Sequence, residues 1–173
     1  MSLIHVIFRN VLAVIRNGIK ADIVQLLKTY PKAYWDLIII HIPCIKVAVS
    51  GNRWYGKGRP KHHERIEYLL WANEVWELCI EKSKKCALEN PVSIIFKELN
   101  FDDIFYIQPW QFGHGETKKT GFGTVGFLKR LKPTNIVEGR EQRVWKMPPS
   151  PDRSKMRSKT LVGIGDALAD QWG

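Results

Sequence analysis

Apolar and polar residues follow one another in blocks that predict a mixed order of helices and strands. Helical spacing of apolar residues predicts helices over Leu3–Ile15 and Ile23–Thr29, and Pro31 ends the second one. The isoleucine-rich run Trp35–Ile42 lacks alternation, which is typical of a central parallel strand buried on both faces. Glu64–Lys85 carries the clearest helical pattern. The first half of the chain therefore predicts helices on either side of a buried strand.

The second half carries shorter apolar runs and more glycine. Cys86–Leu88 and Phe105–Ile107 predict short strands. Thr120–Leu128 predicts an edge strand, which its glycines weaken, and Leu161–Trp172 predicts a closing helix. Strands that alternate with helices favour an α/β fold.

We therefore expect one α/β domain over residues 1–173, with a partial Rossmann-like, mostly parallel sheet and flanking helices. Within it, residues 1–31 form a divergent helical segment and residues 32–128 form the α/β core. Residues 129–173 form an irregular basic loop region with a terminal helix.

Two predicted strand ends carry residues suited to chemistry. Trp35–Ile42 runs into Pro43–Cys44, and Cys86–Leu88 runs into Glu89–Asn90. The helix between them makes a βαβ unit, whose two parallel strands end at the same edge of the sheet. Neighbouring strands lie about 4.8 Å apart, so the cysteine and the glutamate are expected to address one small ligand.

A partly ionised cysteine thiol can attack an electron-poor carbon, and a nearby carboxylic acid can protonate the ring under attack. Lys46, Arg53 and Lys57 lie near Cys44 in the sequence and are expected to lower its pKa. The pair suits covalent activation of a flat heterocycle. Taken singly, a cysteine such as Cys44 is more often a small buried hydrophobe than a nucleophile, and Glu89 also suits a helix cap or a salt-bridge partner.

Composition and charge narrow the class of protein. Hydrophobic residues make up 45% and charged residues 25% of the chain, as in globular proteins, and no run of 18 apolar residues predicts a membrane span. The net charge of +10 is uneven, with +4 over residues 1–111 and +6 over the shorter stretch 112–173. Such a surface favours polyanions, of which nucleic acid is the commonest, although solubility alone would also explain it.

The three cysteines, Cys44, Cys79 and Cys86, predict neither a disulfide framework nor a metal cluster, and they suit a reducing cytosol. His62 and His63 lack a third ligand at metal-site spacing, so no metal is expected.

Basic residues beside aromatic and glycine-rich segments are the candidate DNA contacts. Trp54 is expected to stack on a base or to pack within its loop. The candidates are Arg53, Trp54, Lys57, Lys118, Lys119, Arg140 and Arg143.

Several stretches together resemble the DNA cytosine-5 methyltransferases, specifically the small, divergent members encoded by phages and prophages. Pro43–Cys44 is similar to the nucleophile motif of that family, and Glu89–Asn90 is similar to its Glu-Asn motif. Longer stretches similar to the phage branch are Ala48–Tyr55, Gln108–His114, Lys132–Glu141 and Met147–Trp172.

The resemblance implies a class I methyltransferase-like fold and a DNA substrate in a bacterial host cytoplasm. In the family, the cysteine adds to C6 of cytosine, the glutamate contacts N3, and C5 takes a methyl group from S-adenosylmethionine. The target base leaves the duplex to reach the pocket. Carried over, Cys44 is the nucleophile, Glu89 is its acid partner, Asn90 and Pro43 shape the site, and Asp22 contacts the cofactor adenine.

Departures from the family pattern accompany the resemblance. No Phe-x-Gly-x-Gly motif is present, and no glycine precedes Gly18, which predicts weak or absent cofactor binding. Ile42 and Ile45 flank the nucleophile motif and are expected to raise the pKa of Cys44. The chain is thus expected to be a shortened or divergent member, inactive or dependent on a partner. The alternatives are a non-catalytic DNA-binding module and a phage anti-restriction protein.

Overall fold

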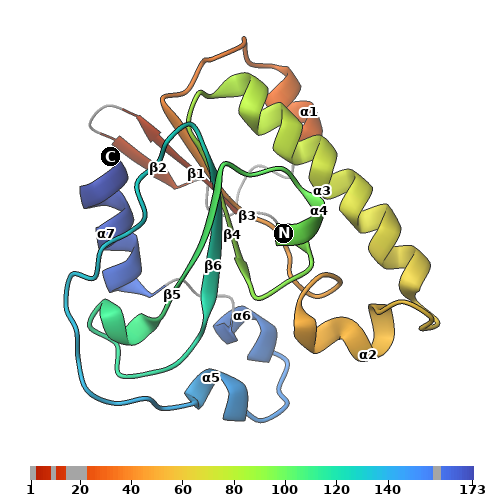
Figure 1. Cartoon of the computed structure of the whole chain (residues 1–173), viewed down its shortest axis with the longest axis vertical. Helices are drawn as coiled ribbons and strands as arrows, with labels where there is room; N and C mark the ends of the chain where they lie inside the picture. Colours follow the sequence, from red (N-terminus) through yellow and green to blue (C-terminus); the bar gives the residue numbers. More distant parts are fainter. Residues whose placement is uncertain (1–2, 9–10, 15–22, 158–160) are drawn as a thin grey trace.

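The computed structural model describes residues 3–8, 11–14, 23–157 and 161–173. Its centre is a six-stranded sheet in the order β2-β1-β3-β4-β6-β5 (Figure 1). The strands are β1 (Leu3–Phe8), β2 (Val11–Val14), β3 (Leu37–His41), β4 (Cys86–Pro91), β5 (Asp103–Ile107) and β6 (Thr120–Val125).

The sheet is mixed, and the predicted mostly parallel arrangement is wrong. Within the described residues, β3 and β4 form the one parallel pair, whereas β1–β2, β1–β3, β4–β6 and β5–β6 are antiparallel. The parallel pair is joined by α3 (His62–Lys82), so the predicted βαβ unit is present. The connection from β4 to β5 contains α4 (Ile95–Glu98), and that from β5 to β6 contains η2 (Pro109–Gln111).

The predicted helix over Leu3–Ile15 is also wrong, because this segment supplies β1 and β2. β1 pairs with β3 through the register Ile4↔Ile40 and Val6↔Ile38. An apolar run of this length cannot be assigned by spacing alone, and its isoleucines and valines favour a strand. The expectation that residues 1–31 are helical therefore holds only for α1 (Ile23–Lys28).

Helices cover both faces of the sheet (Figure 1). Alternate β3 residues enter different cores, because side chains along a strand point to opposite faces. Ile38 and Ile40 join the core with α1, α3 and α4 (Ile95–Glu98), and Leu37 and Ile39 join the core with α7 (Val162–Trp172). The predicted burial of this strand on both faces is confirmed.

The remaining helical segments are short. They are η1 (Val49–Gly51), α2 (Asn52–Tyr55), η2 (Pro109–Gln111), α5 (Arg143–Lys146) and α6 (Arg153–Arg157). The irregular region expected over residues 129–173 therefore contains the helical turns α5 and α6 before the terminal helix. Among the described residues, no helix has the length and apolar character needed to cross a bilayer.

The expected edge position of β6 is wrong, because this strand lies between β4 and β5. The glycines that weaken its pattern leave space for aromatic rings. A Cβ on Gly121 would lie 2.6 Å from the Phe96 ring, and one on Gly123 would lie 2.4 Å from the Phe101 ring. The glycines thus allow two rings to cover an internal strand.

Candidate active site at the ends of β3 and β4

The parallel strands β3 and β4 bring the two predicted tips together. His41 is opposite Glu89 in the strand register. One residue further along each strand, the Asn90 side chain is buried and donates from Nδ2 to the Ile42 carbonyl at 3.1 Å. This contact ties the two strand ends together just before Pro43–Cys44.

Cys44 is half-buried, and its thiol has a raised pKa. Burial is the main cause and the Glu89 carboxylate the second, whereas the positive charges of Lys118 and Arg157 act in the opposite direction. The cysteine and the glutamate are therefore close enough to interact electrostatically. At neutral pH the thiol is protonated, so attack requires that it first lose its proton.

The expectation that Lys46, Arg53 and Lys57 lower this pKa does not match the structure. The Lys46 ammonium pairs with Glu64 at 3.2 Å, and the cations that act on the thiol come from other segments. Ile42 is buried and Ile45 is 63% exposed, so only one of the two flanking isoleucines adds to the apolar surroundings.

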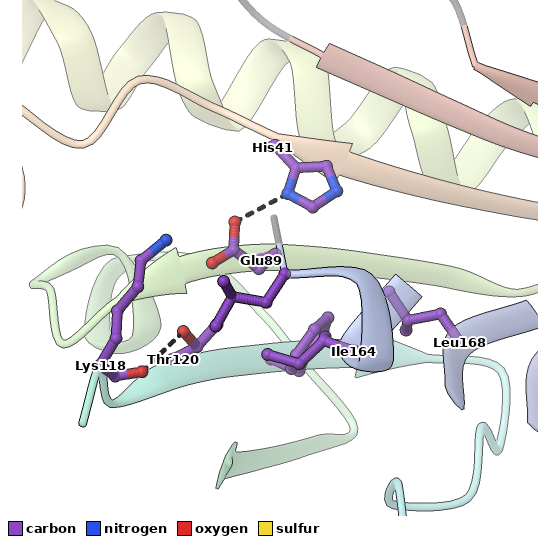
Figure 2. Close-up of a pocket in the computed structure, with 8 residues that line it drawn as sticks. His41, Glu89, Lys118, Thr120, Ile164 and Leu168 are labelled. Carbon is purple, nitrogen blue, oxygen red and sulfur yellow. Dashed lines mark hydrogen bonds and ion pairs between the residues drawn. The ribbon is translucent and has the colours of Figure 1, made fainter. Parts of the chain in front are cut away.

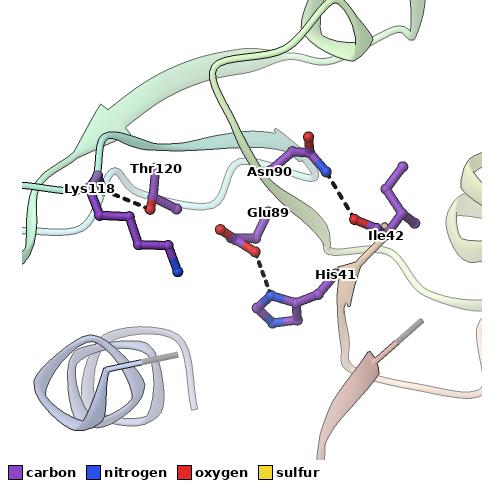
Figure 3. Close-up of polar contacts among 6 residues, drawn as sticks. All are labelled: His41, Ile42, Glu89, Asn90, Lys118 and Thr120. Carbon is purple, nitrogen blue, oxygen red and sulfur yellow. Dashed lines mark hydrogen bonds and ion pairs between the residues drawn. The ribbon is translucent and has the colours of Figure 1, made fainter. Parts of the chain in front are cut away.

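The Glu89 carboxylate lies in a polar group that pattern reasoning did not identify. His41 Nδ1 is 2.7 Å from Glu89 Oε2, and both side chains are largely covered. The Lys118 ammonium and the His41 ring are directed to the same side of β4 as this carboxylate, whereas Asn90 is directed toward Ile42 (Figure 3). The signal available in the sequence was the parallel pair itself, which places residue 41 beside residue 89.

These residues line one end of a small cavity (Figure 2). His41, Glu89, Lys118 and Thr120 form its polar end, and α7 covers it with apolar side chains that include Ile164 and Leu168. Its volume of about 20 Å³ has room for about one water molecule. Cys44 does not line this cavity, so a bound base would have to contact both groups from the open side of the strand tips.

The segment that carries Cys44 is held by hydrogen bonds to its carbonyl groups. Tyr68 donates from its hydroxyl to the Pro43 carbonyl at 2.5 Å, and Arg65 donates from Nε to the Lys46 carbonyl at 2.6 Å. The Cys44 carbonyl accepts from the amides of Val47 and Ala48 at 3.1 and 2.8 Å. The cysteine thus lies in a closed turn with side-chain donors before and after it.

Arg65 is buried, with 3% of its surface exposed, and its Nη2 has no hydrogen-bond partner within the described part of the chain. Leaving a buried donor without a partner costs roughly 1–3 kcal/mol. Sequence reasoning did not identify Arg65 or Tyr68, because an arginine near the start of an exposed helix ordinarily points to solvent.

The candidate DNA contacts lie in different surroundings. Arg53 and Trp54 are on α2, where the Arg53 guanidinium lies 5.2 Å from the half-exposed Trp54 ring, and Lys57 follows in an exposed loop. Lys118 lies at the cavity beside Glu89 rather than on an open surface. The Lys119 ammonium lies over the Tyr106 ring at 4.5 Å.

The remaining two candidates lie near the carboxy-terminal region and contact the protein itself. The Arg140 guanidinium lies over the Trp110 ring at 4.0 Å, and its side chain is exposed. Arg143 donates to Glu116 at 2.9 Å, and the Glu116 side chain is 9% exposed. Arg143 therefore neutralises a buried carboxylate, and Arg140 is the better placed of the two to contact a phosphate.

The cavity beside Glu89 is too small for S-adenosylmethionine. Asp22, the predicted adenine contact, lies outside the described residues. In the described ranges, no group of three or more His, Cys, Asp and Glu side chains is arranged to bind a metal ion.

No family model matches the chain, and no match is found among curated proteins or solved structures. Any assignment of function therefore depends on the residues at the two strand tips.

Proposed function

We propose that this chain is a DNA cytosine-5 methyltransferase-like protein that activates a cytosine through a covalent adduct with Cys44. The observation that supports the proposal best is the meeting of Cys44, Glu89 and Lys118 at one end of the parallel pair. In the complete reaction, S-adenosylmethionine would supply the methyl group to C5. Because the cavity beside Glu89 is too small for this cofactor, the residues of this chain account only for the steps on the base.

The chemistry begins when the Cys44 thiol transfers its proton to the Glu89 carboxylate and the resulting thiolate adds to C6 of the pyrimidine. The S–C6 bond forms, the C5=C6 electron pair moves toward C5, and Glu89 passes the proton to N3. C5 then behaves as an enamine carbon and takes a proton from solvent. Loss of the original C5 proton, return of the N3 proton to Glu89 and cleavage of the S–C6 bond restore cytosine and thiolate.

The raised pKa of Cys44 fits an attack that depends on the bound nucleobase. The Glu89 carboxylate is one cause of this raised pKa. When a cytosine binds, the carboxylate shares a proton with N3, and the effect of its negative charge on the thiol becomes weaker. Binding of the nucleobase would therefore weaken the effect by which Glu89 opposes ionisation of the Cys44 thiol. Lys118 and Arg157 would continue to favour the thiolate. The thiol would thus be less reactive without a bound nucleobase than with one.

The test is exchange of the C5 hydrogen of deoxycytidine in DNA dissolved in D₂O, measured by mass spectrometry of the recovered nucleosides. It requires the cysteine adduct but no methyl donor. Single-stranded and duplex oligonucleotides are both supplied, because a base outside the stack is the reactive form. The native chain is expected to catalyse exchange, and Cys44→Ala is expected to reduce it to background.

Glu89→Gln is expected to slow exchange by about a hundredfold, the usual contribution of one proton-transfer group. Cys79→Ala is the matched control, because it removes a buried thiol that lies on α3 in the hydrophobic core. Exchange that survives in Cys44→Ala, or its absence from the native chain on every oligonucleotide, would contradict the proposal.

A non-catalytic DNA-binding module is the second candidate, and the protonated, half-buried state of the Cys44 thiol favours it. This candidate predicts DNA binding that weakens with salt and is unchanged in Cys44→Ala. Binding without exchange would select it.

A further inference from the structure

The strongest unassigned feature near the proposed site is the set of donors that hold the turn around Cys44. Carbonyl groups on both sides of the cysteine accept side-chain hydrogen bonds: Ile42 from Asn90, Pro43 from Tyr68, and Lys46 from Arg65. Asn90 comes from β4, whereas Arg65 and Tyr68 lie on α3. Residues three apart on a helix share a face, so Arg65 and Tyr68 reach the same loop.

We propose that Arg65 and Tyr68 are positioning residues for Cys44, which hold the turn from Pro43 to Lys46 and so fix the place of the thiol beyond the end of β3. The inference deepens the proposed function and rests on Cys44 being its nucleophile. Neither residue has to touch the base, because both act through the backbone of the cysteine loop.

Burial supports a role in geometry. Arg65 is 3% exposed and places a guanidinium in the protein interior for a single hydrogen bond to the Lys46 carbonyl. Within the described residues, its Nη2 lacks a hydrogen-bond partner. An apolar residue would fill such a position more favourably if packing were its only purpose, since buried charges are unfavourable without pairing.

Tyr68 combines the loop contact with closeness to the thiol. Its hydroxyl donates to the Pro43 carbonyl at 2.5 Å, and its ring packs against Trp71 with centroids 5.1 Å apart. Burial is the main cause of the raised pKa of this hydroxyl, and the Cys44 charge is the second. The hydroxyl therefore remains protonated and able to donate across the working pH range.

The experiment uses the reactivity of the thiol in the full-length chain. Cys79 and Cys86 are fully buried and Cys44 is half-buried, so iodoacetamide is expected to modify Cys44 alone. Intact mass gives the number of modified thiols, and the time course gives the rate. C5 hydrogen exchange on DNA is measured in parallel.

Tyr68→Phe and Arg65→Met are compared with Tyr34→Phe and Arg59→Met, which change an exposed tyrosine and an exposed arginine. Each loop variant is expected to raise the rate of Cys44 alkylation about threefold to tenfold over its control, because one hydrogen bond no longer closes the loop. Exchange is expected to fall about tenfold to a hundredfold, since small misplacement of a reacting atom has effects of that size. Arg65→Lys, which keeps a donor, should lie between the native chain and Arg65→Met in both measurements.

The two proposals fail in different ways. If the native chain shows no exchange, the proposed function fails, and alkylation alone decides whether the loop is held by these residues. A rate of Cys44 alkylation in Tyr68→Phe and Arg65→Met equal to that of their control variants would overturn the positioning role. Modification of all three thiols would also overturn it, because the residues would then support the core and not the loop.

Discussion

The cysteine tip and the basic carboxy-terminal region use polar side chains in different ways. At the tip, Tyr68 and Arg65 donate to backbone carbonyls of the loop that carries Cys44. In the region from Lys129 to Arg157, Arg140 and Arg153 also donate to backbone carbonyls, but two other arginines pair with carboxylates. Arg130 pairs with Asp103, and Arg143 pairs with Glu116.

This difference shows that net charge is a poor measure of a DNA-binding surface. The carboxy-terminal stretch carries more than half of the net charge, yet two of its arginines already neutralise carboxylates. Arg140 lies over Trp110 and keeps its guanidinium exposed. Each arginine therefore makes a different contribution to binding, and substitutions can separate them.

The largest expected effect follows from breaking the pair between Arg143 and Glu116. Arg143→Gln is expected to lower the free energy of unfolding by about 1–3 kcal/mol, because it leaves a buried carboxylate without its cation. Denaturant titration measures this difference. Arg140→Gln is the matched control and should change stability by less than about 0.5 kcal/mol, as at other surface positions.

DNA binding should show the reverse order. Arg140→Gln is expected to reduce the salt dependence of DNA affinity by about one counterion, and Arg143→Gln by less. Fluorescence anisotropy over a salt series measures both slopes. If Arg143→Gln had the larger effect on the slope and none on stability, the contrast between the two arginines would be wrong.

A smaller effect is expected at the cysteine tip when the charge of Glu89 is removed. Glu89→Gln should lower the pKa of the Cys44 thiol, because a negative charge no longer opposes ionisation, although burial still raises it. The rate of alkylation at pH 7.5 should rise roughly tenfold, as for loss of one close charge. Glutamine keeps an oxygen for the His41 contact, so the change is mainly electrostatic.

Lys118→Met gives the opposite sign and serves as the counterpart. Loss of this cation should raise the pKa of Cys44 and slow alkylation, since Lys118 favours the thiolate. Equal rates in Glu89→Gln, Lys118→Met and the native chain would show that the thiol and the carboxylate do not interact.

The parts of the fold that the sequence predicted are those with an unambiguous local pattern. The run of β3 is continuously apolar and rich in isoleucine, and the helices α3 and α7 show helical spacing over many residues. β1 and β2 were misassigned because short apolar runs fit a helix or a strand equally well. The internal place of β6 depends on Phe96 and Phe101, which are distant in sequence from the glycines they cover.

The same distinction applies to the site. The proximity of Cys44 and Glu89 follows from one parallel strand pair, which the βαβ pattern predicts. The same strand pair places His41 beside Glu89. Arg65, Tyr68 and Arg157 become visible only when tertiary packing sets their directions, because no spacing rule links α3 or α6 to the cysteine loop. The expected lowering of the Cys44 pKa by cations near in sequence was wrong for the same reason, since Lys46 pairs with Glu64.

The smallest expected effect concerns the second arginine pair. Arg130 binds Asp103 through two hydrogen bonds of 2.7 and 2.6 Å, and these bonds are the main cause of the lowered pKa of Asp103. A carboxylate whose pKa is lower in the folded than in the unfolded state stabilises the protein at pH values above its unfolded-state pKa. This contribution is lost as the pH falls through its folded-state pKa. Both side chains are partly exposed, so the contribution at pH 7 should be below about 1 kcal/mol.

Asp103→Asn should therefore be slightly less stable than the native chain at pH 7, and the difference should fade as the pH falls below about 4. High salt should also reduce it, because exposed charges are screened. Asp166→Asn, at an exposed position on α7, is the control and should show no such pH dependence. A difference that persists unchanged at low pH would mean that Asp103 supports the β5–β6 hairpin by packing, and that Arg130 remains available to an anionic partner.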